Sequence, residues 1–270
     1  MIKKHLRVLS LGAGVQSTAL ALMIEKGELP MVDCAIFADV GAEPKLVYEH
    51  LDWLEKQLSY PIHRVQFRDL KQDMIDASLG KYKFMAIPLF IKNMETNKKG
   101  ILRRQCTYDY KIKPVQQKVR ELLGYKKGER VVKDTKVEML MGISWDELQR
   151  QKINQIKYIT NVYPLIDKQI RRYQCLRWME DNNYPEPPRS ACTFCPYHSN
   201  LDWNEIKKNK EEWEEVIKID EMVRHSAKAN KNDEVFIHKS CVPLKDADLR
   251  SAEEKGQYSL LDECEGMCGI

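Results

Sequence analysis

The chain organises its fold around one early stretch, His5-Leu-Arg-Val-Leu-Ser10-Leu-Gly12-Ala-Gly14-Val-Gln16-Ser17-Thr18. Its first half is apolar and typical of a short buried strand. Its second half predicts a turn and then an apolar helix over Ala19–Ile24, which Gly27 ends. Small residues let the backbone come close to a phosphate, and the amide groups and dipole of a helix start favour negative charge. The stretch therefore indicates a phosphate-binding turn, which we call the glycine turn (Leu11–Gly14).

Two other phosphate-binding patterns are absent from this stretch. A Walker A loop needs Lys-Ser or Lys-Thr after its glycines, whereas this chain has Gln16-Ser17-Thr18 there. The dinucleotide pattern GxGxxG needs a third glycine at the position of Ser17. An ordinary tight turn between a strand and a helix explains the same residues, so the stretch alone leaves both interpretations open.

Strands and helices alternate after the glycine turn. Apolar runs predict strands over Asp33–Ala38 and Ile62–Phe67, and helical spacing predicts a helix over Lys45–Leu58 between them. A further helix over Leu70–Ala77 follows, with Asp69 as its cap. This alternation predicts an α/β fold with a doubly wound parallel sheet. Ligands of such sheets bind beyond the carboxyl ends of the strands, where the glycine turn and Asp39 both lie.

The second half of the chain predicts a fourth strand and a cysteine-containing helical extension. The strand covers Val137–Gly142, and a long helix is expected over Asp202–Ala227. Lys92–Arg104 is polar and basic, as a mobile loop would be. We expect a nucleotide-binding α/β domain over residues 1–185, and a second part over residues 186–270 with the Cys192-x-x-Cys195 pattern, the long helix and a tail.

Length and composition describe a soluble globular protein. The 270 residues can form one large domain, or one domain with an appended subdomain. No apolar run approaches the ~20 residues of a membrane helix, and Gly12, Gly14 and Gln16 would interrupt the apolar core of a signal peptide. We therefore expect an intracellular, cytoplasmic protein, in which eight cysteines indicate metal or redox chemistry rather than structural disulfides.

The clearest cysteine pattern is Cys192-Thr-Phe-Cys195, which we call the cysteine turn. Two thiolates at this spacing can bind zinc or the irons of a cluster, or form a redox dithiol. Cys106 lies in a loop among cations, which favour its thiolate form. Cys34 and Cys175 fall within a predicted strand and a predicted helix, so both are expected to be small core residues.

Positive charge is concentrated between Lys92 and Lys133, where thirteen Lys or Arg stand against four Asp or Glu. A solvated surface, a polyphosphate-binding face and a nucleic-acid patch all agree with such a block. We keep nucleic acid as one expected partner of this segment.

Five stretches follow one another over roughly residues 6 to 196: Ser10–Thr18, Phe37–Gly41, Cys106–Pro114, Gly142–Arg150, and Tyr163–Asp167 followed by a helix and the cysteine turn. In this order they resemble the PP-loop, the strand-end Asp-Thr-Gly, the Cys-Cys-x-x-x-Lys-x-x-Pro segment, the Gly-x-Arg-x-x-(Glu/Gln)-Ser-x-x-Arg strand exit, and the Cys-x-x-Cys end of the phosphoadenosine-phosphosulfate (PAPS) reductase family. That family belongs to the PP-loop ATP pyrophosphatase superfamily.

The resemblance implies a site for an adenine nucleotide, ATP or PAPS, with Mg²⁺ bridging its phosphates. The implied nucleotide-binding residues are Ser10, Gly12, Gly14, Gln16, Ser17, Thr18, Asp39 and Gly142. Asp39, Arg150 and Cys268 are also implied as catalytic residues. The Lys-Asp pair of the family's loop is replaced by Val15-Gln16, so Arg150 or Arg172 must meet the phosphate charge.

The resemblance also implies a [4Fe–4S] cluster. Its implied ligands are Cys106, Cys192, Cys195 and a fourth group, which we assign to Cys264, with Cys268 or an exogenous sulfur as alternatives. Thr107 stands where the family has the second cysteine of a tandem pair, so one ligand must come from elsewhere. The Glu-Cys-Gly-Leu-His ending of the reductases is not reproduced by the tail of this chain.

These departures favour ATP-dependent sulfur transfer over a strict PAPS reductase. An acceptor, for example nucleic acid, would be adenylated with release of pyrophosphate and then thiolated by sulfide or a sulfur-donor protein. Two alternatives stay open: a PAPS or adenylylsulfate reductase, in which Cys264 or Cys268 attacks the sulfate sulfur, and a zinc-braced nucleotide-binding protein without redox chemistry. A nucleotide-binding regulator and a homodimeric assembly are also open.

Overall fold

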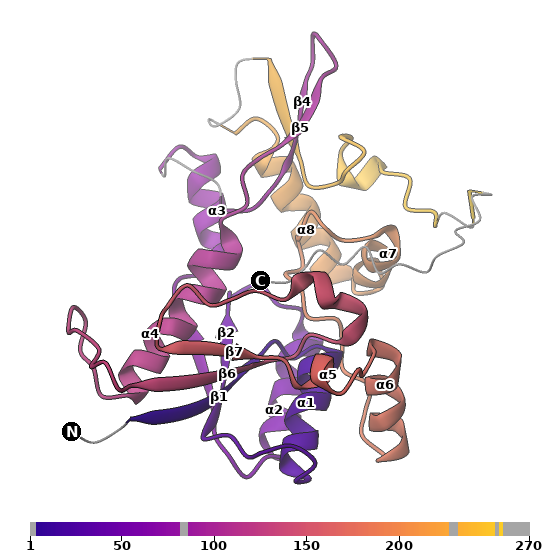
Figure 1. Ribbon diagram of the computed structural model, residues 1–270. Helices are drawn as coiled ribbons and strands as arrows, with labels where there is room; N and C mark the ends of the chain where they lie inside the picture. The colour runs from indigo at the N-terminus through magenta and orange to yellow at the C-terminus, as the bar shows by residue number, and fades with distance from the viewer. Residues whose placement is uncertain (1–3, 82–85, 227–231, 252–253, 256–270) are drawn as a thin grey trace. The chain divides into compact units, whose positions relative to one another are not determined.

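The computed structural model describes residues 4–81, 86–226, 232–251 and 254–255 (Figure 1). Contacts divide the chain into two units. The first consists of Met1–Asp39, Lys45–Gln66 and Ile112–Ser190, and the second of Val40–Pro44, Phe67–Lys111 and Ala191–Ile270. These units differ from the expected division at residue 185, because two earlier segments of the chain pack with its cysteine-containing part.

A five-stranded parallel sheet forms the centre of the first unit, as the alternation of strands and helices predicts. Its strands are β1 (His5–Leu11), β2 (Cys34–Asp39), β3 (Ile62–Gln66), β6 (Lys136–Met141) and β7 (Ile159–Val162). Their order in the sheet is β3-β2-β1-β6-β7. The fold class is therefore α/β with a doubly wound parallel sheet.

Helices cover both faces of this sheet (Figure 1). They are α1 (Val15–Glu25), α2 (Lys45–Glu55), α4 (Lys113–Leu122), α5 (Pro164–Asp167) and α6 (Arg172–Asp181). Leu9 and Phe37 pack into one apolar cluster with α1, α2 and α6, whereas Val8 and Ile36 pack into another with α4. Neighbouring strand residues thus point to opposite layers, as pleated strands require.

The strand order reverses between β1 and β6. From β1 the chain continues to β2 and β3 on one side, and it later adds β6 and β7 on the other side. Such a switch point opens a crevice at the carboxyl ends of the two strands, and ligands of doubly wound sheets bind there. The glycine turn follows β1 at this end of the sheet.

The second unit has its own core of buried apolar residues, which include Leu70, Phe194 and Trp203. Its elements are α3 (Leu70–Ser78), β4 (Phe90–Asn93), β5 (Lys99–Ile101), α7 (Asn200–Lys208), α8 (Lys210–Val223), β8 (Asp233–Phe236) and the short helix η3 (Leu244–Asp246). The three strands form an antiparallel sheet in the order β5-β4-β8.

Two expectations for this unit were wrong in detail. The segment Lys92–Arg104, expected as a loop, contains the end of β4 and the whole of β5, which pair as a hairpin. The helix expected over Asp202–Ala227 is two helices, because Asn209 has an extended backbone and its side chain accepts a hydrogen bond from the amide of Glu212. Asn209 thereby caps a new helix instead of continuing the old one.

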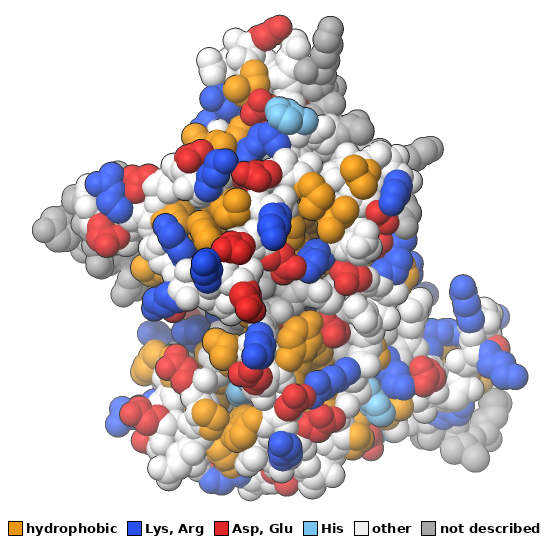
Figure 2. Space-filling model, turned by 180° about the vertical axis from the view of Figure 1, so that it is seen from behind, with side chains coloured by type: hydrophobic (Ala, Val, Ile, Leu, Met, Phe, Trp, Pro, Cys, Tyr) orange, Lys and Arg blue, Asp and Glu red, His pale blue; other side chains and the backbone are white. Residues whose placement is uncertain are grey.

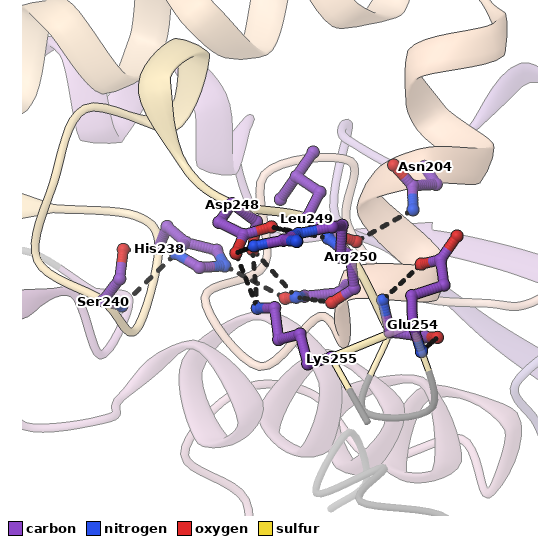
Figure 3. A network of polar contacts seen from close by, with 10 residues as sticks. Asn204, His238, Ser240, Asp248, Leu249, Arg250, Glu254 and Lys255 are labelled. Atoms are coloured by element: carbon purple, nitrogen blue, oxygen red, sulfur yellow. Dashed lines mark hydrogen bonds and ion pairs between the residues drawn. The ribbon is translucent and has the colours of Figure 1, made fainter. Parts of the chain in front are cut away.

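The C-terminal described segment is bound to side chains of α7 and to its own lysine (Figure 3). Asn200 donates to the carbonyls of Asp248 and Arg250 at 3.1 and 2.7 Å, and Asn204 donates to that of Leu249 at 3.0 Å. Lys255 donates to the Asp248 carbonyl at 3.2 Å. The tail cysteines Cys264 and Cys268 lie outside the described residues, beyond this anchored segment.

None of the helices in the described part of the chain is both long and apolar enough to cross a lipid bilayer. On the face shown in Figure 2, acidic and basic side chains are intermingled.

Candidate nucleotide site and cysteine turn

The glycine turn leads from β1 directly into α1 through a strained residue and a bare helix start. Ala13 has a φ of 56°, in the left-handed region that ordinary residues rarely adopt. Gly14 is the N-cap of α1, and in the described residues no side chain caps that helix. Ser17 closes the turn, because its Oγ accepts from the Gly12 amide and donates to the Gly14 carbonyl, both at 3.2 Å. The first amides of α1 are thereby presented at the carboxyl end of the sheet.

Gly142 is the residue that lets β6 pass the start of α1. A Cβ at position 142 would lie 2.7 Å from the Ser17 Cα and 2.8 Å from its backbone nitrogen. By contrast, a Cβ on Gly12 would meet only the Ser17 Oγ, at an ordinary 3.7 Å. The close approach of β6 to α1 at the switch point therefore depends on the missing side chain of Gly142.

Three side chains form a network beside the start of α1. The Gln16 amide nitrogen donates to Glu147 Oε2 at 3.1 Å and to Ser144 Oγ at 3.4 Å. The other Glu147 oxygen is paired with Arg150 at 2.5 Å. Ser144, Glu147 and Arg150 come from the segment after β6, where the short helix η2 covers Trp145–Arg150. Gln16 and Arg150, both expected in the site, are thus brought together through Glu147.

Two further contacts fix the surroundings of this site. Thr18 is fully buried, and its hydroxyl is 3.0 Å from His50 Nε2. Burial lowers the pKa of His50 to about 4, so its imidazole is neutral at physiological pH. Asp39, the last residue of β2, accepts a hydrogen bond from the Tyr48 hydroxyl at 2.8 Å. Thr18 is therefore a packing residue of this site, whereas Asp39 is a carboxylate held at the sheet edge.

The cysteine turn lies in the second unit. The Cys195 amide donates to the Cys192 carbonyl at 2.9 Å, and both thiols are partly exposed. His198 follows, with Nε2 at 2.8 Å from the Cys192 carbonyl and with Nδ1 buried and without a hydrogen-bond partner in the described residues. The expected core cysteines are buried, and burial raises the pKa of Cys34 to about 11 and that of Cys175 to about 12.

Cys106 belongs to the same unit as the cysteine turn. It packs at the edge of the apolar cluster that Cys192 also touches, and a π-helical segment over Thr107–Ile112 follows it. Such segments are rare and are frequent at functional sites. Nearby in sequence, Lys111 pairs with the buried Glu43 at 3.3 Å, and the second Glu43 oxygen has no hydrogen-bond partner in the described residues.

The described residues do not complete a metal site. No three His, Cys, Asp or Glu side chains in that part of the chain are placed to hold one ion. Cys106, Cys192 and Cys195 alone therefore do not fit a cluster, and Cys264, the expected fourth ligand, lies outside the described residues. Mg²⁺ is usually held by one or two carboxylates together with substrate phosphates. Asp39 and Glu147 could supply the carboxylates, and a bound nucleotide would have to supply the phosphates.

The basic block between Lys92 and Lys133 does not belong to one unit. Its first part, up to Lys111, lies in the second unit, and the rest lies in the first. Several of its cations have local partners: Lys118 pairs with Glu121 at 2.6 Å, and Arg120 donates to the Glu129 carbonyl at 2.6 Å. The nucleic-acid partner stays a prediction.

The sequence alone assigns no role to two carboxylates near the two turns, Glu147 and Glu43. Glu147 lies within the Gly142–Arg150 stretch, but its link to Gln16 is a contact between residues 131 positions apart, which the sequence does not show. Glu43 follows Asp39 in a polar turn, and only its burial shows that it is more than a solvated carboxylate. A carboxylate in a turn after a buried strand is the one signal that could have singled out either residue.

No family model and no curated protein matches this chain. Among solved structures, it is similar to the phosphoadenylyl-sulfate (PAPS) reductase from Candida auris in a phosphate complex, with a TM-score of 0.43 and 14% sequence identity. The match covers 69% of this chain and 76% of the reductase chain. A likeness at this identity and TM-score says nothing about the chemistry of the site.

Proposed function

We propose that this chain is an enzyme that binds ATP at the glycine turn and activates an acceptor by adenylylation for sulfur transfer. The observation that carries the proposal is the start of α1, which no side chain caps in the described residues and which lies at the switch point of the sheet. Gly142, which has no side chain, lets the end of β6 pack directly against the backbone of Ser17 there. Backbone amides and a helix dipole at that place favour phosphate groups. The neighbouring Asp39 and Arg150 offer a carboxylate and a cation to the same edge of the sheet.

The proposed reaction has two steps. An acceptor oxygen forms a bond to the α-phosphorus of ATP, the bond to the bridging oxygen of the β-phosphate breaks, and pyrophosphate leaves with the electron pair. The acceptor proton passes to solvent. Hydrosulfide then forms a bond to the activated carbon, and the bond from that carbon to the adenylylated oxygen breaks. AMP leaves with this oxygen and the electron pair, and the hydrosulfide proton passes to solvent. Mg²⁺ would neutralise the phosphate charge in the first step.

In this proposal the residues of the first unit bind and orient the nucleotide. Gly12, Gly14 and the first amides of α1 contact the phosphates, and Arg150 meets part of their charge. The Asp39 carboxylate, which the Tyr48 hydroxyl orients, would face the magnesium ion. Ser17 holds the turn in its closed form through both of its hydrogen bonds.

Release of pyrophosphate tests the proposal. The full chain is incubated with Mg²⁺, α-labelled ATP, sulfide and total cellular nucleic acid, and both pyrophosphate and label transfer are measured. Pyrophosphate together with thiolated nucleic acid supports the proposal. Sulfite released from PAPS in a parallel assay, with no pyrophosphate from ATP, would identify a reductase instead. Binding of ATP without any turnover would leave a nucleotide-binding regulator.

We also propose that Cys106, Cys192, Cys195 and Cys264 hold a [4Fe–4S] cluster, which would require the three described cysteines to come closer together than they lie in this structure, where they are not placed to hold one ion. The spacing of the cysteine turn supports this proposal, because two cysteines separated by two residues, both partly exposed, can bind the irons of a cluster. A cluster would supply redox or sulfur-handling chemistry. Iron and acid-labile sulfide in anaerobically purified protein, lost in the Cys192→Ala/Cys195→Ala variant, would support it, whereas one zinc and no sulfide would refute it.

A further inference from the structure

Ser240, His238 and Asn200 form a chain of hydrogen bonds in the second unit, separate from the proposed nucleotide site. The Ser240 Oγ lies 2.7 Å from His238 Nδ1, and Figure 3 shows the two residues side by side. The other ring nitrogen, Nε2, lies 3.2 Å from Asn200 Oδ1. His238 is 3% exposed, whereas Ser240 is partly exposed and accessible to a reagent. A hydroxyl, an imidazole and an amide in this order match a nucleophile, its base and the group that orients the base.

The hydrogen bonds of Asn200 determine which nitrogen of His238 carries the proton. The Asn200 amide nitrogen donates to two backbone carbonyls of the C-terminal segment, at 3.1 and 2.7 Å. Carbonyl oxygens only accept, so Asn200 Oδ1 is the atom that faces the ring, and it accepts from Nε2. Burial, and then the charges of Lys239 and Lys255, lower the pKa of His238 to about 4, so the ring is neutral at physiological pH. Nδ1 therefore carries a lone pair.

The turn that carries Ser240 holds its hydroxyl against this lone pair. The Cys241 amide donates to the His238 carbonyl at 3.0 Å, and Cys241 has a φ of 58°, in the strained left-handed region. Lys99 donates to the Ser240 carbonyl at 2.9 Å. The Ser240 amide is 3.3 Å from the same ring nitrogen, which is longer than the contact of the hydroxyl. The hydroxyl proton therefore has a base as its acceptor, as activation of a serine requires.

We propose that Ser240 is an activated nucleophile that accepts the acyl group of carboxylic esters, with His238 as its general base and Asn200 as a positioning residue. The Oγ forms a bond to the carbonyl carbon while Nδ1 takes the hydroxyl proton. The ester C–O bond then breaks, and the alcohol leaves with the electron pair and the proton from Nδ1. A water oxygen next bonds to the acyl carbon, and its proton passes through Nδ1 to the departing Oγ. The nearby charges of Lys239 and Lys255 favour the negative charge that develops on the carbonyl oxygen.

A fluorophosphonate probe tests the nucleophile in the full chain, because its reaction bonds the serine oxygen to phosphorus and releases fluoride. We expect one label per chain at pH 7, which peptide mass spectrometry places on Ser240. Ser240→Ala, or unfolding of the wild-type protein in urea, should abolish the label, and p-nitrophenyl acetate should compete with the probe. Ser251→Ala is the matched control, since Ser251 is also partly exposed but its Oγ accepts from the amide of Glu254 at 3.1 Å. Its labelling should equal that of the wild type.

His238→Gln separates the base from its structural contact. A glutamine amide nitrogen can still donate to Asn200 Oδ1 from the place of Nε2, but it offers no basic nitrogen to Ser240. The labelling rate should fall at least about tenfold while circular dichroism stays unchanged. Asn200→Asp keeps an acceptor for Nε2, so it should label faster than Asn200→Ala. If Asn200 only anchored the C-terminal segment through its donors, these two variants would behave alike.

Folded wild-type protein without a label on Ser240 would overturn the proposal. An equal labelling rate in folded His238→Gln would overturn the role of the base, and equal rates in the two Asn200 variants would overturn the positioning role. Failure of p-nitrophenyl acetate to compete would overturn the ester as substrate. If His238→Gln does not fold, His238→Asn provides the test, because its amide nitrogen takes the place of Nδ1 without the basicity. None of these outcomes bears on ATP binding, which is proposed for the other unit.

Discussion

The glycine turn and the cysteine turn are both short turns beside buried elements, but the polar groups around them differ. Around the glycine turn, Ser17, Gln16 and Glu147 each have hydrogen-bond partners within the first unit. In the described residues, the buried side-chain atoms without a hydrogen-bond partner all lie in the second unit. They include Glu43 Oε2, His198 Nδ1, Trp203 Nε1 and Arg224 Nη1.

The two units therefore depend on different physical terms. A buried polar atom without a partner costs about 1–3 kcal/mol, so the second unit carries a cost that the glycine turn avoids. The glycine turn depends on shape, because a single Cβ at position 142 would block it. The second unit depends on charge pairing, because the buried carboxylates of Glu43 and Asp220 are paired there with Lys111 and Arg224. Substitutions in each unit test these two dependences.

Asp220→Ala should have the largest effect on stability. Asp220 is 1% exposed, is paired with Arg224, and accepts from the amides of Ile237 and Leu244, both at 2.9 Å. Alanine would leave a buried guanidinium without its carboxylate and two amides without acceptors, which costs about 4 kcal/mol. Urea unfolding measures this loss.

Glu205→Ala is the control, since Glu205 forms an exposed pair with Lys208 and its removal should cost about 0.5 kcal/mol or less. A loss below about 1 kcal/mol for Asp220→Ala would contradict the dependence of the second unit on charge pairing.

Gly142→Ala should be the most harmful single methyl group in the first unit. The new Cβ would overlap the Cα and the backbone nitrogen of Ser17. A change of side-chain rotamer cannot relieve this overlap, because both atoms belong to the backbone. We expect a loss of about 3 kcal/mol in unfolding free energy and the loss of ATP binding. Gly12→Ala adds the same methyl group with ordinary contacts, so it should fold with nearly unchanged stability.

Equal stability of the two alanine variants would sink the shape argument. Retained ATP binding in Gly142→Ala would also separate the glycine turn from the nucleotide site. In either case the first unit would depend less on backbone fit than its close contact at Ser17 indicates.

The sequence predicts the first unit well, because its signals are local. Apolar runs identify β1 and β2, and Gly27, with a φ of 76°, follows the end of α1 as predicted. The match of Gly142 with Ser17 is not local, since it joins residues 125 positions apart, and no periodicity shows it. Gly142 itself was expected in the site only through a family resemblance.

Prediction fails in the second unit for identifiable reasons. The hairpin of β4 and β5 carries Lys92, Lys98 and Lys99, and such a polar composition resembles a loop. Apolar spacing continues across Asn209 from Trp203 to Val216, so the break between α7 and α8 leaves the helical period intact. Asn209 followed three residues later by a glutamate is a capping signal, and it could have located the break. Which partners the buried polar groups find depends on tertiary contacts alone.

The stability of the two units should depend on pH in the same way, although one unit depends on backbone fit and the other on charge pairing. Burial lowers the pKa of His50 in the first unit and that of His238 in the second to about 4. In the unfolded chain these two histidines take up protons below their usual pKa of about 6.5, whereas in the folded chain their imidazoles stay neutral. Stability is therefore complete above about pH 6.5 and falls as the pH drops toward 4, by about 2 kcal/mol per histidine at pH 5.

Urea unfolding between pH 7 and 5 checks this expectation through the slope rather than the absolute stability. His50→Gln and His238→Gln should each remove a similar share of the acid-induced loss. His5→Gln, at an exposed position, should leave the slope as it is in the wild type. A slope that only one of the two buried substitutions reduces would show that the units respond to acid differently.

The smallest effect is expected at Ala13, where two terms of opposite sign meet. Glycine would relieve the positive φ of 56°, which costs an L-residue about 1–2 kcal/mol. It would also remove a fully buried methyl group and add backbone freedom to the unfolded chain, which together cost a similar amount. Gln169 has the same φ of 56° but an exposed side chain, so Gln169→Gly loses no buried surface and should stabilise the chain by about 0.5 kcal/mol. Comparison of the urea midpoints of the two variants isolates the contribution of the buried Ala13 methyl group. A larger gain in stability at Ala13 than at Gln169 would show that backbone strain in the glycine turn exceeds what burial of this methyl group contributes.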